Sequence, residues 1–545
     1  MTTRKLSALV TLALTAALLL LGACRRGATG AFVLVLEANP DPRALNPLIA
    51  GDAASERYRQ LLFNSLMKKD ERFDYVPELA TGAQVSPDGL TVTVTVRDGV
   101  KFHNGKPLTS ADVKYTFDKL LASTSPKSAS FYETVAPAAT QSADASKQGQ
   151  SSSTPAPTRQ PFITSIDAPD ARTAVFHLRR PWLELFANLI PIGIIPEGSY
   201  ETQQSSPVGT GPYKFVSANS AQQFADFAAF DDYWEGAPQV KNLRVRVILD
   251  AGTQQAGLLS GEVDLAVNTA LTPDTYTNLA KGPTLQVVQA PGANVQYIAF
   301  NTQHAPLSDA RVRQAIAYAI NREDIIKNLL QDQARVAHSI VPPESWAYNE
   351  GKTYSFDPAQ AKKLLDDAGL KDPDGDGVRK RFDKPLAFKI SATNAVGRQT
   401  AGIIQNALAE VGVPVDIQTL EDNTMRDQVQ KGDFDMTMGR WVGGNQDPIF
   451  LRDLFTYLQG KENRFNRSRY SNPELDKVLA AATSTADRTR ARELYAQAQQ
   501  LISNEVPMLP LWYWNNIVVA KKTVSNISVP PSGDWTFVRN LTVAK

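Results

Sequence analysis

Residues 77–121 read PELATGAQVSPDGLTVTVTVRDGVKFHNGKPLTSADVKYTFDKLL, and this stretch carries the clearest local structure in the chain. Within it, residues 90–102 alternate apolar and polar side chains, which predicts a strand that leads into a turn. Gly99 and Gly105 stand where turns need a positive φ or close packing. The Ser-Ala-Asp segment at 110–112 predicts a helix start, because its side chains can accept hydrogen bonds from free backbone N–H groups.

Residues 310–330, ARVRQAIAYAINREDIIKNLL, repeat apolar side chains at helical spacing after Ser308 and Asp309, and they predict a capped helix. Helix and strand signals are mixed along the whole chain, which favours an α/β or α+β protein. The chain has 545 residues, more than the ~250 to 300 beyond which a single core stops growing. We therefore expect two or three lobes, with a cleft between them as the natural place for a ligand.

The N-terminus has the composition of an export signal. Arg4 and Lys5 precede the almost wholly apolar run 6–21, which is shorter than the ~20 residues that a membrane-spanning helix needs. No other stretch is apolar enough to span a membrane. We therefore predict a signal peptide at residues 1–23, followed by a soluble body.

Residues 21–24, Leu-Gly-Ala-Cys, resemble the bacterial lipobox, in which lipoprotein signal peptidase cuts before a cysteine whose sulfur carries a diacylglycerol. Cys24 is the only cysteine, so disulfides and cysteine-based metal sites are excluded. We predict that Cys24 becomes a lipid-anchored N-terminus on a bacterial membrane, facing the periplasm or the exterior. The alternative is a lone buried cysteine that acts as a small hydrophobic residue.

Six segments, taken in order, resemble the extracellular solute-binding proteins of family 5, which are the peptide, opine and nickel receptors of ABC importers. The first segment is 77–121, with its R-x-G-V-K-F-H-x-G turn. The other five are VGTGPYKF at 208–215, NTQHAPLSDARVRQAIAYAINRE at 301–323, AKKLLDDAGL at 361–370, YSNPELDKVL at 470–479 and EVPMLPLWYW at 505–514. Each piece alone is weak, but six in family order make the resemblance specific.

This resemblance implies an α/β, two-lobed periplasmic-binding-protein fold of type II, cluster C, with an extra inserted subdomain. It divides the chain into lobe I at 31–57, 181–283 and 511–545, the inserted subdomain at 58–180, and lobe II at 284–510. Residues 136–161 have almost no large apolar side chain, so we predict a disordered loop there. Two crossing strands would form the hinge, near 295–302 and 508–515.

The resemblance places ligand contacts in GRWVGGNQDPIFL at 439–451. In peptide-binding relatives, a tryptophan in this segment is followed by an acid that pairs with the free amine of a peptide, and then by a second acid. The predicted contacts are Trp441, Gly443, Gly444, Asn445 and Asp447. The amine-binding acid falls on Gly444, and a buried ammonium without a counter-ion costs several kcal/mol. Either another acid serves, or the ligand is not a simple free-amine peptide.

Asp52 is the predicted substitute for the missing acid. In relatives, the segment just after an L-D-P motif lines the cleft, and L-N-P at 45–47 puts Gly51, Asp52 and Ala53 at that place. The alternative is that Asp52 caps a helix that starts near Ala53.

Several aromatic residues are further candidates for the cleft. Trp512 and Trp514 lie two apart on a predicted strand and share a face, which points to the core or to the cleft. We expect Trp514 near the ligand, and an aromatic wall from Phe131 and Tyr132. Trp441 either stacks on a ligand or plugs its lobe.

The segment DPDGDGVRKRFD at 372–383 fits a calcium loop. Asp372, Asp374 and Asp376 take positions 1, 3 and 5, and Asp383 takes position 12, where Glu is usual. If calcium binds, we expect a structural role, and we expect no other cofactor. The alternative is a turn-rich loop without an ion.

The main rival class, an enzyme, finds little support. The chain has no G-x-S-x-G, no H-E-x-x-H and no Gly-rich phosphate loop, and its four histidines lack ligand-like spacing. A hydrolase would need an unrecognised pair of acids. Removal of residues 1–23 would leave 55 basic and 56 acidic side chains, a formal charge of −1, so no nucleic-acid partner is indicated.

We therefore predict a monomeric, lipid-anchored receptor, not an enzyme, that captures an oligopeptide-like solute by lobe closure. It would deliver the solute to an ABC permease that works with ATPase subunits. A receptor for an opine, a sugar or a nickel complex is the alternative that Gly444 keeps open.

The first testable prediction concerns Cys24. The Cys24→Ser variant should move to the soluble fraction or stall in processing, because the thioether is the only proposed anchor. Fractionation of cells that express each form measures this. Unchanged membrane retention of the variant would remove the lipoprotein prediction.

Overall fold

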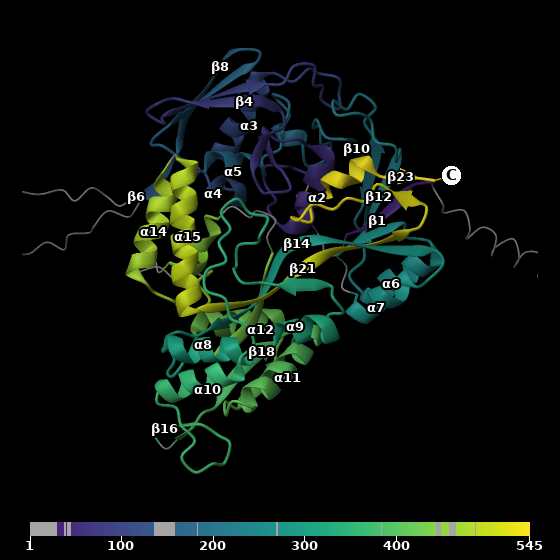
Figure 1. Cartoon of the computed structure of the whole chain (residues 1–545). Coiled ribbons are helices and arrows are strands. Elements are labelled where there is room, and N and C mark those ends of the chain that lie inside the picture. The colour runs from purple at the N-terminus through teal and green to yellow at the C-terminus, as the bar shows by residue number, and fades with distance from the viewer. Residues whose placement is uncertain are drawn as a thin grey trace, which may run out of the picture.

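A computed structural model describes residues 30–36, 40, 45–135, 158–182, 184–268, 271–382, 384–442, 448–456, 465–485 and 487–544. Helices and strands are mixed along the chain and form two lobes joined by long strands (Figure 1). Within the described ranges, no helix is long and apolar enough to cross a membrane. Cys24 and the predicted signal peptide lie outside the described residues.

One mixed sheet runs through both lobes. In the described part of the chain it has 11 strands. The order is β10 (Tyr213–Asn219), β11 (Phe224–Ala229), β12 (Asn242–Val247), β1 (Phe32–Leu36), β13 (Leu265–Val267), β21 (Met508–Lys521), β14 (Leu285–Phe300), β20 (Met436–Trp441), β18 (Phe388–Ala392) and β19 (Val415–Thr419), and β15 (Ala334–Val336) pairs with β21 off this path.

The antiparallel strands β14 and β21 join the two lobes. The C-terminal end of β21 pairs with β13 of the first lobe, whereas the C-terminal end of β14 pairs with β20 of the second lobe. The β14–β21 register breaks between Ala290 and Asn294. A Cβ on Gly292 would lie 2.1 Å from the carbonyl oxygen of Trp514, so only glycine allows this close approach of the two strands.

The other elements of the first lobe surround its half of the sheet. They are α2 (Ala53–Leu62), α5 (Leu185–Leu189), α6 (Ala251–Ser260), α7 (Pro273–Ala280), the short helices η1 (Tyr200–Thr202) and η3 (Trp535–Asn540), and the hairpins β2 (Met67–Lys69) with β3 (Tyr75–Pro77) and β22 (Val524–Ser525) with β23 (Thr542–Val543). Tyr58 and Leu61 of α2 join the largest apolar core, together with Trp535 of η3. This packing fixes α2 against the C-terminal segment.

Residues 77–121 form the predicted strand, turn and helix. The strands β4 (Ala80–Val85), β5 (Thr91–Val96), β9 (Thr173–Leu178) and β8 (Ile163–Asp170) form a separate four-stranded sheet. Gly99 and Gly105 adopt φ of 75° and 85°. Helix α3 (Ser110–Ala122) follows, and its cap is Thr109, whose backbone N–H and hydroxyl both donate to Asp112 at 2.9 Å.

The predicted loop at 136–161 needs a correction at its C-terminal end. Residues 158–161 form β7 (Thr158–Pro161), which pairs with β6 (Tyr132–Val135) after the short helix α4 (Pro126–Ala129). The guanidinium of Arg159 also lies 4.2 Å from the centre of the Tyr132 ring. Backbone pairing and this cation–π contact order a segment whose composition alone predicts disorder. Residues 136–157 lie outside the described residues.

The second lobe carries most of the long helices. Its remaining elements are α8 (Ala310–Ala319), α9 (Arg322–Asp324), the π-helical turn η2 (Ile325–Leu329), α10 (Pro358–Asp367), β16 (Lys380–Arg381), β17 (Lys384–Pro385), α11 (Ala395–Ala409), α12 (Asp422–Lys431), α13 (Phe450–Phe455), α14 (Pro473–Ser484) and α15 (Arg488–Glu505). The single helix predicted at 310–330 is broken after Ala319. The side chain of Asn321 accepts from the N–H of Asp324 at 3.1 Å and starts a new helical turn.

His103 ties the turn after β5 to the segment before β10. Its Nε2 lies 3.1 Å from the carbonyl oxygen of Gly211, and its Nδ1 accepts the N–H of Gly209 at 3.3 Å. Both ring nitrogens are therefore used by the neutral imidazole. Burial lowers the pKa of His103 to about 4.

A pH dependence of stability follows from His103. The pKa in the unfolded chain is about 6.5, so between pH 6.5 and 4 the unfolded chain binds the proton more strongly. The free energy of unfolding should therefore fall as the pH drops through this window, by roughly 3 kcal/mol at most. Urea unfolding across this range measures it. The His103→Asn variant should lack this part of the loss, and identical profiles for both proteins would contradict the assignment.

Candidate ligand-binding cleft

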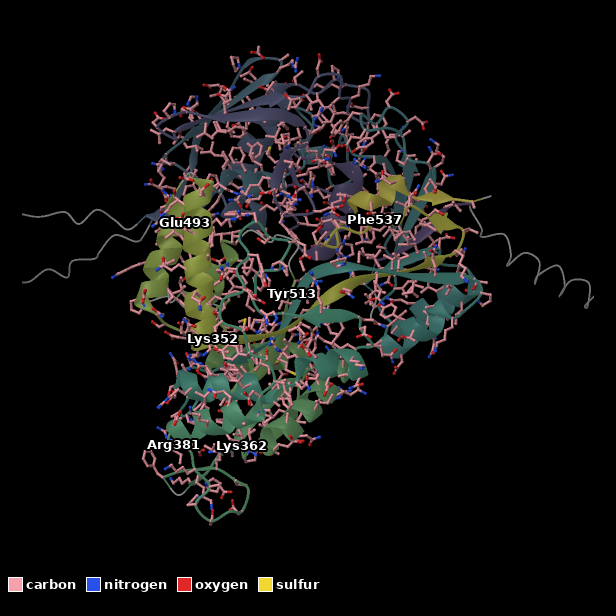
Figure 2. The ribbon with its side chains drawn as sticks, in the orientation of Figure 1. Lys352, Lys362, Arg381, Glu493, Tyr513 and Phe537 are labelled. Carbon is pink, nitrogen blue, oxygen red and sulfur yellow. The ribbon has the colours of Figure 1, made fainter. Side chains whose placement is uncertain are left out.

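A cavity of about 790 Å³ lies between the lobes, a volume typical of sites for small molecules. Most of its wall belongs to the first lobe and comes from α2, the β2–β3 hairpin, α4 and η3, and Phe537 of η3 is labelled in Figure 2. The lining also includes Asn294 of β14 and Val442, directly after β20, and loop residues such as Asn268 and Pro530. The cavity is therefore bounded by both lobes and by one of the strands that join them.

The wall of the cavity contains a buried charge cluster. The Nζ atom of Lys127 lies 2.6 Å from Oε1 of Glu56 and donates to the carbonyl oxygens of Pro47 and Pro191, each at 2.8 Å. Arg59 donates to the other carboxylate oxygen of Glu56 at 2.5 Å. Burial acts to raise the pKa of Glu56, but the charges of Lys127 and Arg59 outweigh it and hold the pKa below its usual value. Glu56 is therefore ionised and ties α2 to α4.

A second polar group lies on the same face of α2. Arg57 donates to Asp534 at 3.3 Å, and Gln60 donates to the same carboxylate oxygen at 2.7 Å. Ala53, Glu56, Arg57 and Gln60 all line the cavity, and their spacing is that of one helix face. Arg57 and Gln60 are not among the predicted contacts, although the polar stripe along residues 53–60 is a signal in the sequence that points to them.

The structure places Gly51 and Ala53 in the lining of the cavity. Asp52 stands between them and caps α2, because its carboxylate accepts from the N–H of Ser55 at 2.9 Å and from the Ser55 hydroxyl. The capping alternative for Asp52 is therefore correct. A ligand contact by Asp52 stays a prediction, since a carboxylate has further lone pairs for a second donor.

Trp441 lies in the second lobe and Trp514 lies on β21, which joins the lobes, and neither is among the described residues that line the cavity. Trp441 stacks on Phe450 with ring centres 5.5 Å apart and packs against the α13–α15 core. Trp514 meets Trp512 edge to face at 5.9 Å and donates to Gln296 at 3.3 Å. Both rings therefore pack on neighbouring aromatic side chains in this arrangement.

Phe131 and Tyr132 have different surroundings, although they are neighbours in the sequence. Phe131 lines the cavity, and the Tyr132 hydroxyl donates to the carbonyl oxygen of Leu121 instead. Val442 is 52% exposed at the cavity wall. The four predicted contacts that follow it, Gly443, Gly444, Asn445 and Asp447, lie outside the described residues.

The predicted calcium loop lies in the second lobe, near β16 at the bottom of Figure 1. Asp372, Asp374 and Asp376 bring carboxylate oxygens within 4.8 Å of one another. The ammonium group of Lys380 contacts Asp374 and lies 3.1 Å from Asp376, so it neutralises part of the charge that a cation would use. Asp383 is outside the described residues. Calcium binding stays a prediction, and this loop is separate from the cavity.

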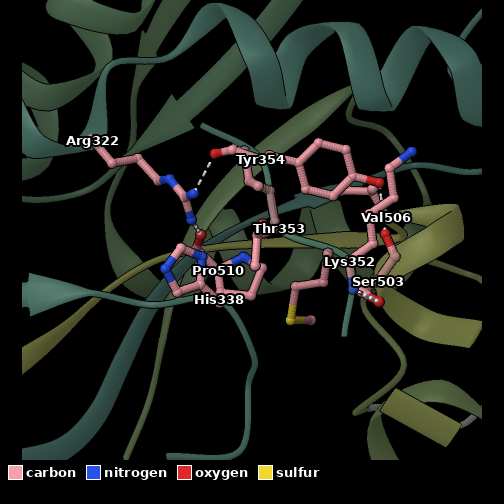
Figure 3. A pocket seen from close by; sticks show the side chains of 10 residues that line it. Arg322, His338, Lys352, Thr353, Tyr354, Ser503, Val506 and Pro510 are labelled. Carbon is pink, nitrogen blue, oxygen red and sulfur yellow. Dashed lines mark hydrogen bonds between the residues drawn. The ribbon is translucent and has the colours of Figure 1, made fainter. Parts of the chain in front are cut away.

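A much smaller cavity, about 10 Å³, lies inside the second lobe beside Arg322 and His338 (Figure 3). The Arg322 guanidinium donates to the carbonyl oxygens of Ala337, Pro510 and Tyr354. Burial lowers the pKa of Arg322 to about 10. The space suffices for about one water molecule, so this cavity does not hold a solute.

Comparisons with known proteins agree with this geometry. The family model of the bacterial extracellular solute-binding proteins, family 5 middle, matches residues 74–463. The chain is 29% identical to the di/tripeptide-binding protein 2 of Pseudomonas aeruginosa, over 85% of this chain and 86% of that protein. It is 30% identical to the heme-binding protein A of Haemophilus influenzae, over 83% of this chain and 81% of that protein.

A solved structure is also similar. The oligopeptide-binding protein AppA from Bacillus subtilis, in complex with a nonapeptide, has a TM-score of 0.69 at 25% identity and covers 94% of this chain and 99% of its own. Fold and cavity together define a two-lobed solute-binding protein. The chain belongs to family 5 of the bacterial extracellular solute-binding proteins, so the predicted family and the two-lobed α/β fold are confirmed.

The charge cluster yields a stability prediction. Lys127→Met should cost roughly 3 kcal/mol of unfolding free energy, because it leaves the buried carboxylate of Glu56 with one cation fewer. Lys101→Met is the matched control, since Lys101 forms an exposed pair with Asp232 at 2.9 Å, and its loss should cost about 1 kcal/mol or less. Urea unfolding of both variants measures the difference. Equal small losses would show that the cluster contributes little.

Proposed function

We propose that the chain is the solute receptor of an ABC importer and that it takes an oligopeptide-like solute into the cavity by lobe closure. The observation that carries the proposal is the 790 Å³ cavity, which is bounded by both lobes and by a strand that joins them. Such an arrangement encloses a ligand when the lobes rotate together. Capture and release need no covalent chemistry.

The names of relatives support a peptide as the ligand. Di/tripeptides are named for the Pseudomonas protein and a nonapeptide for the Bacillus complex. The lining supplies cations, acids and amides, such as Arg57, Asp534 and Asn268, which suit the charged ends and the amide groups of a peptide. A permease with ATPase subunits would accept the solute, and Cys24 would hold the receptor at the membrane.

A non-peptide solute is the second candidate. The observation in its favour is Gly444, the position at which the resemblance to peptide-binding relatives implies the acid for the free amine. Heme is the ligand named for the Haemophilus relative. If a peptide is the ligand, we propose that Asp52, which stands between the lining residues Gly51 and Ala53, replaces the missing acid.

Titration calorimetry with tri-alanine and N-acetyl-tri-alanine tests this proposal. The Asp52→Asn change should weaken binding of the free-amine peptide by roughly 1.5 to 3 kcal/mol, the usual contribution of a charge-assisted hydrogen bond. N-acetylation should cost the same, and the two losses should not add. Ser55→Ala is the matched control, because it removes the hydroxyl that donates to Asp52 and keeps both the carboxylate and the backbone N–H that Asp52 caps.

Ser55→Ala should lower stability by about 1 kcal/mol, the usual net contribution of one hydrogen bond, and leave affinity unchanged. Equal affinities for both peptides in the wild type and in Asp52→Asn would contradict the amine anchor. Absence of any peptide binding would favour the non-peptide solute.

A further inference from the structure

Arg488 makes a contact between the lobes that is separate from the strands that join them. It is the first residue of α15 in the second lobe, and its guanidinium forms an ion pair with Asp74. Asp74 belongs to the turn of the β2–β3 hairpin on the first-lobe side, where its N–H donates to Asp70 at 2.9 Å. Asp70 lines the cavity. The hairpin that Arg488 holds is therefore also part of the cavity wall.

Two aromatic rings enclose the Arg488 guanidinium. Its central carbon lies 3.9 Å from the centre of the Trp346 ring and 5.1 Å from the centre of the Tyr75 ring. Trp346 belongs to the second lobe and is 8% exposed, whereas Tyr75 lies in β3. A cation between two aromatic rings is attracted to both ring faces. Water and salt screen this attraction less than they screen an exposed ion pair.

The second lobe holds this arrangement in place. Arg492, one turn further along α15, donates to the carbonyl oxygen of Trp346 at 2.7 Å, and the Trp346 ring meets Tyr495 edge to face at 5.8 Å. Helix α15 therefore supplies both the cation and the support for the ring beneath it. When the lobes separate, Asp74 and Tyr75 of the hairpin move away from Arg488, whereas Trp346 stays beside it.

Arg488 lies at the end of α15 that is far from β21, so even a small rotation of the lobes displaces its side chain. Figure 2 labels Glu493 in the half of α15 that lies nearer the other lobe, and Lys352 near the opposite end, where the backbone N–H of Lys352 donates to the Ser503 hydroxyl. With ~1.5 Å per residue, Arg488 lies about 25 Å along the helix from its C-terminus, and β21 begins directly after that end. A lobe rotation of only about 10° would move Arg488 by roughly 4 Å and break the pair.

We propose that Arg488, gripped by Asp74, Tyr75 and Trp346, is a latch that holds the lobes together at the hairpin side of the cavity. Its loss shifts the population toward open lobes and so weakens capture of the solute. The link to solute capture rests on the proposed function, whereas the link to lobe closure does not.

Small-angle X-ray scattering of the ligand-free protein tests the latch without any assumption about the solute. Arg488→Ala should have a larger radius of gyration than the wild type. Arg490→Ala is the matched control, because Arg490 lies in the same helical turn and pairs with Glu493 of its own helix at 2.8 Å. It should scatter like the wild type. Identical curves for Arg488→Ala and the wild type would overturn the latch.

A variant of Asp74, on the other side of the ion pair, tests the latch without changing the start of α15. Asp74→Asn should also increase the radius of gyration, and the double variant should not exceed Arg488→Ala. Arg488→Lys keeps the charge but loses the planar stacking group, so it should fall between Arg488→Ala and the wild type. Additive effects of Asp74→Asn and Arg488→Ala would overturn the pairing.

Affinity for tri-alanine tests the link to capture. It should fall about 3- to 30-fold in Arg488→Ala and remain unchanged in Arg490→Ala. Failure of the wild type to bind tri-alanine would count against the proposed peptide function, and the scattering result would still decide the latch. Equal affinities of Arg488→Ala and a binding wild type would overturn the effect on capture.

Discussion

The pairing of β14 with β21 is the constraint on which the two lobes depend. Each strand belongs to both halves of the large sheet, so the lobes share a continuous hydrogen-bonded backbone. Gly292 permits the close approach at the break in register. Beside it, Asn516 of β21 accepts from Asn268 at 2.9 Å and donates to the carbonyl oxygen of Pro530 at 2.9 Å. Asn268 and Pro530 line the cavity, so the strands that join the lobes also position part of the wall.

The first-lobe wall of the cavity contains charged side chains that are largely removed from water. Arg59 and Lys127 are buried and the Glu56 side chain is 21% exposed, so the three groups lose most of the water that would stabilise them separately. Because the three groups compensate one another, α2 and α4 are held at a fixed spacing. A wall of this kind keeps its shape while the second lobe moves, and the polar face of α2 stays directed toward the solute.

Local patterns in the sequence predicted those elements whose structure is determined by residues close to one another in the chain. The alternation at 90–102 gave β5, and the position of Asp52 gave the cap of α2 as one of two alternatives. Contacts between residues far apart in the chain are not visible as a local pattern in the sequence. Arg57 and Asp534 are 477 residues apart, and only the packing of η3 against α2 brings them together. The strand at 158–161 was missed for the same reason, since backbone pairing does not depend on composition.

We propose that the cavity between the lobes carries a peptide. Native mass spectrometry of the protein purified from its own cells tests this most directly, because a retained solute adds its mass to that of the chain. We expect an adduct that, once released, fragments into amino-acid residue masses. A released solute with no such fragments, such as an intact sugar, opine or metal complex, would contradict it.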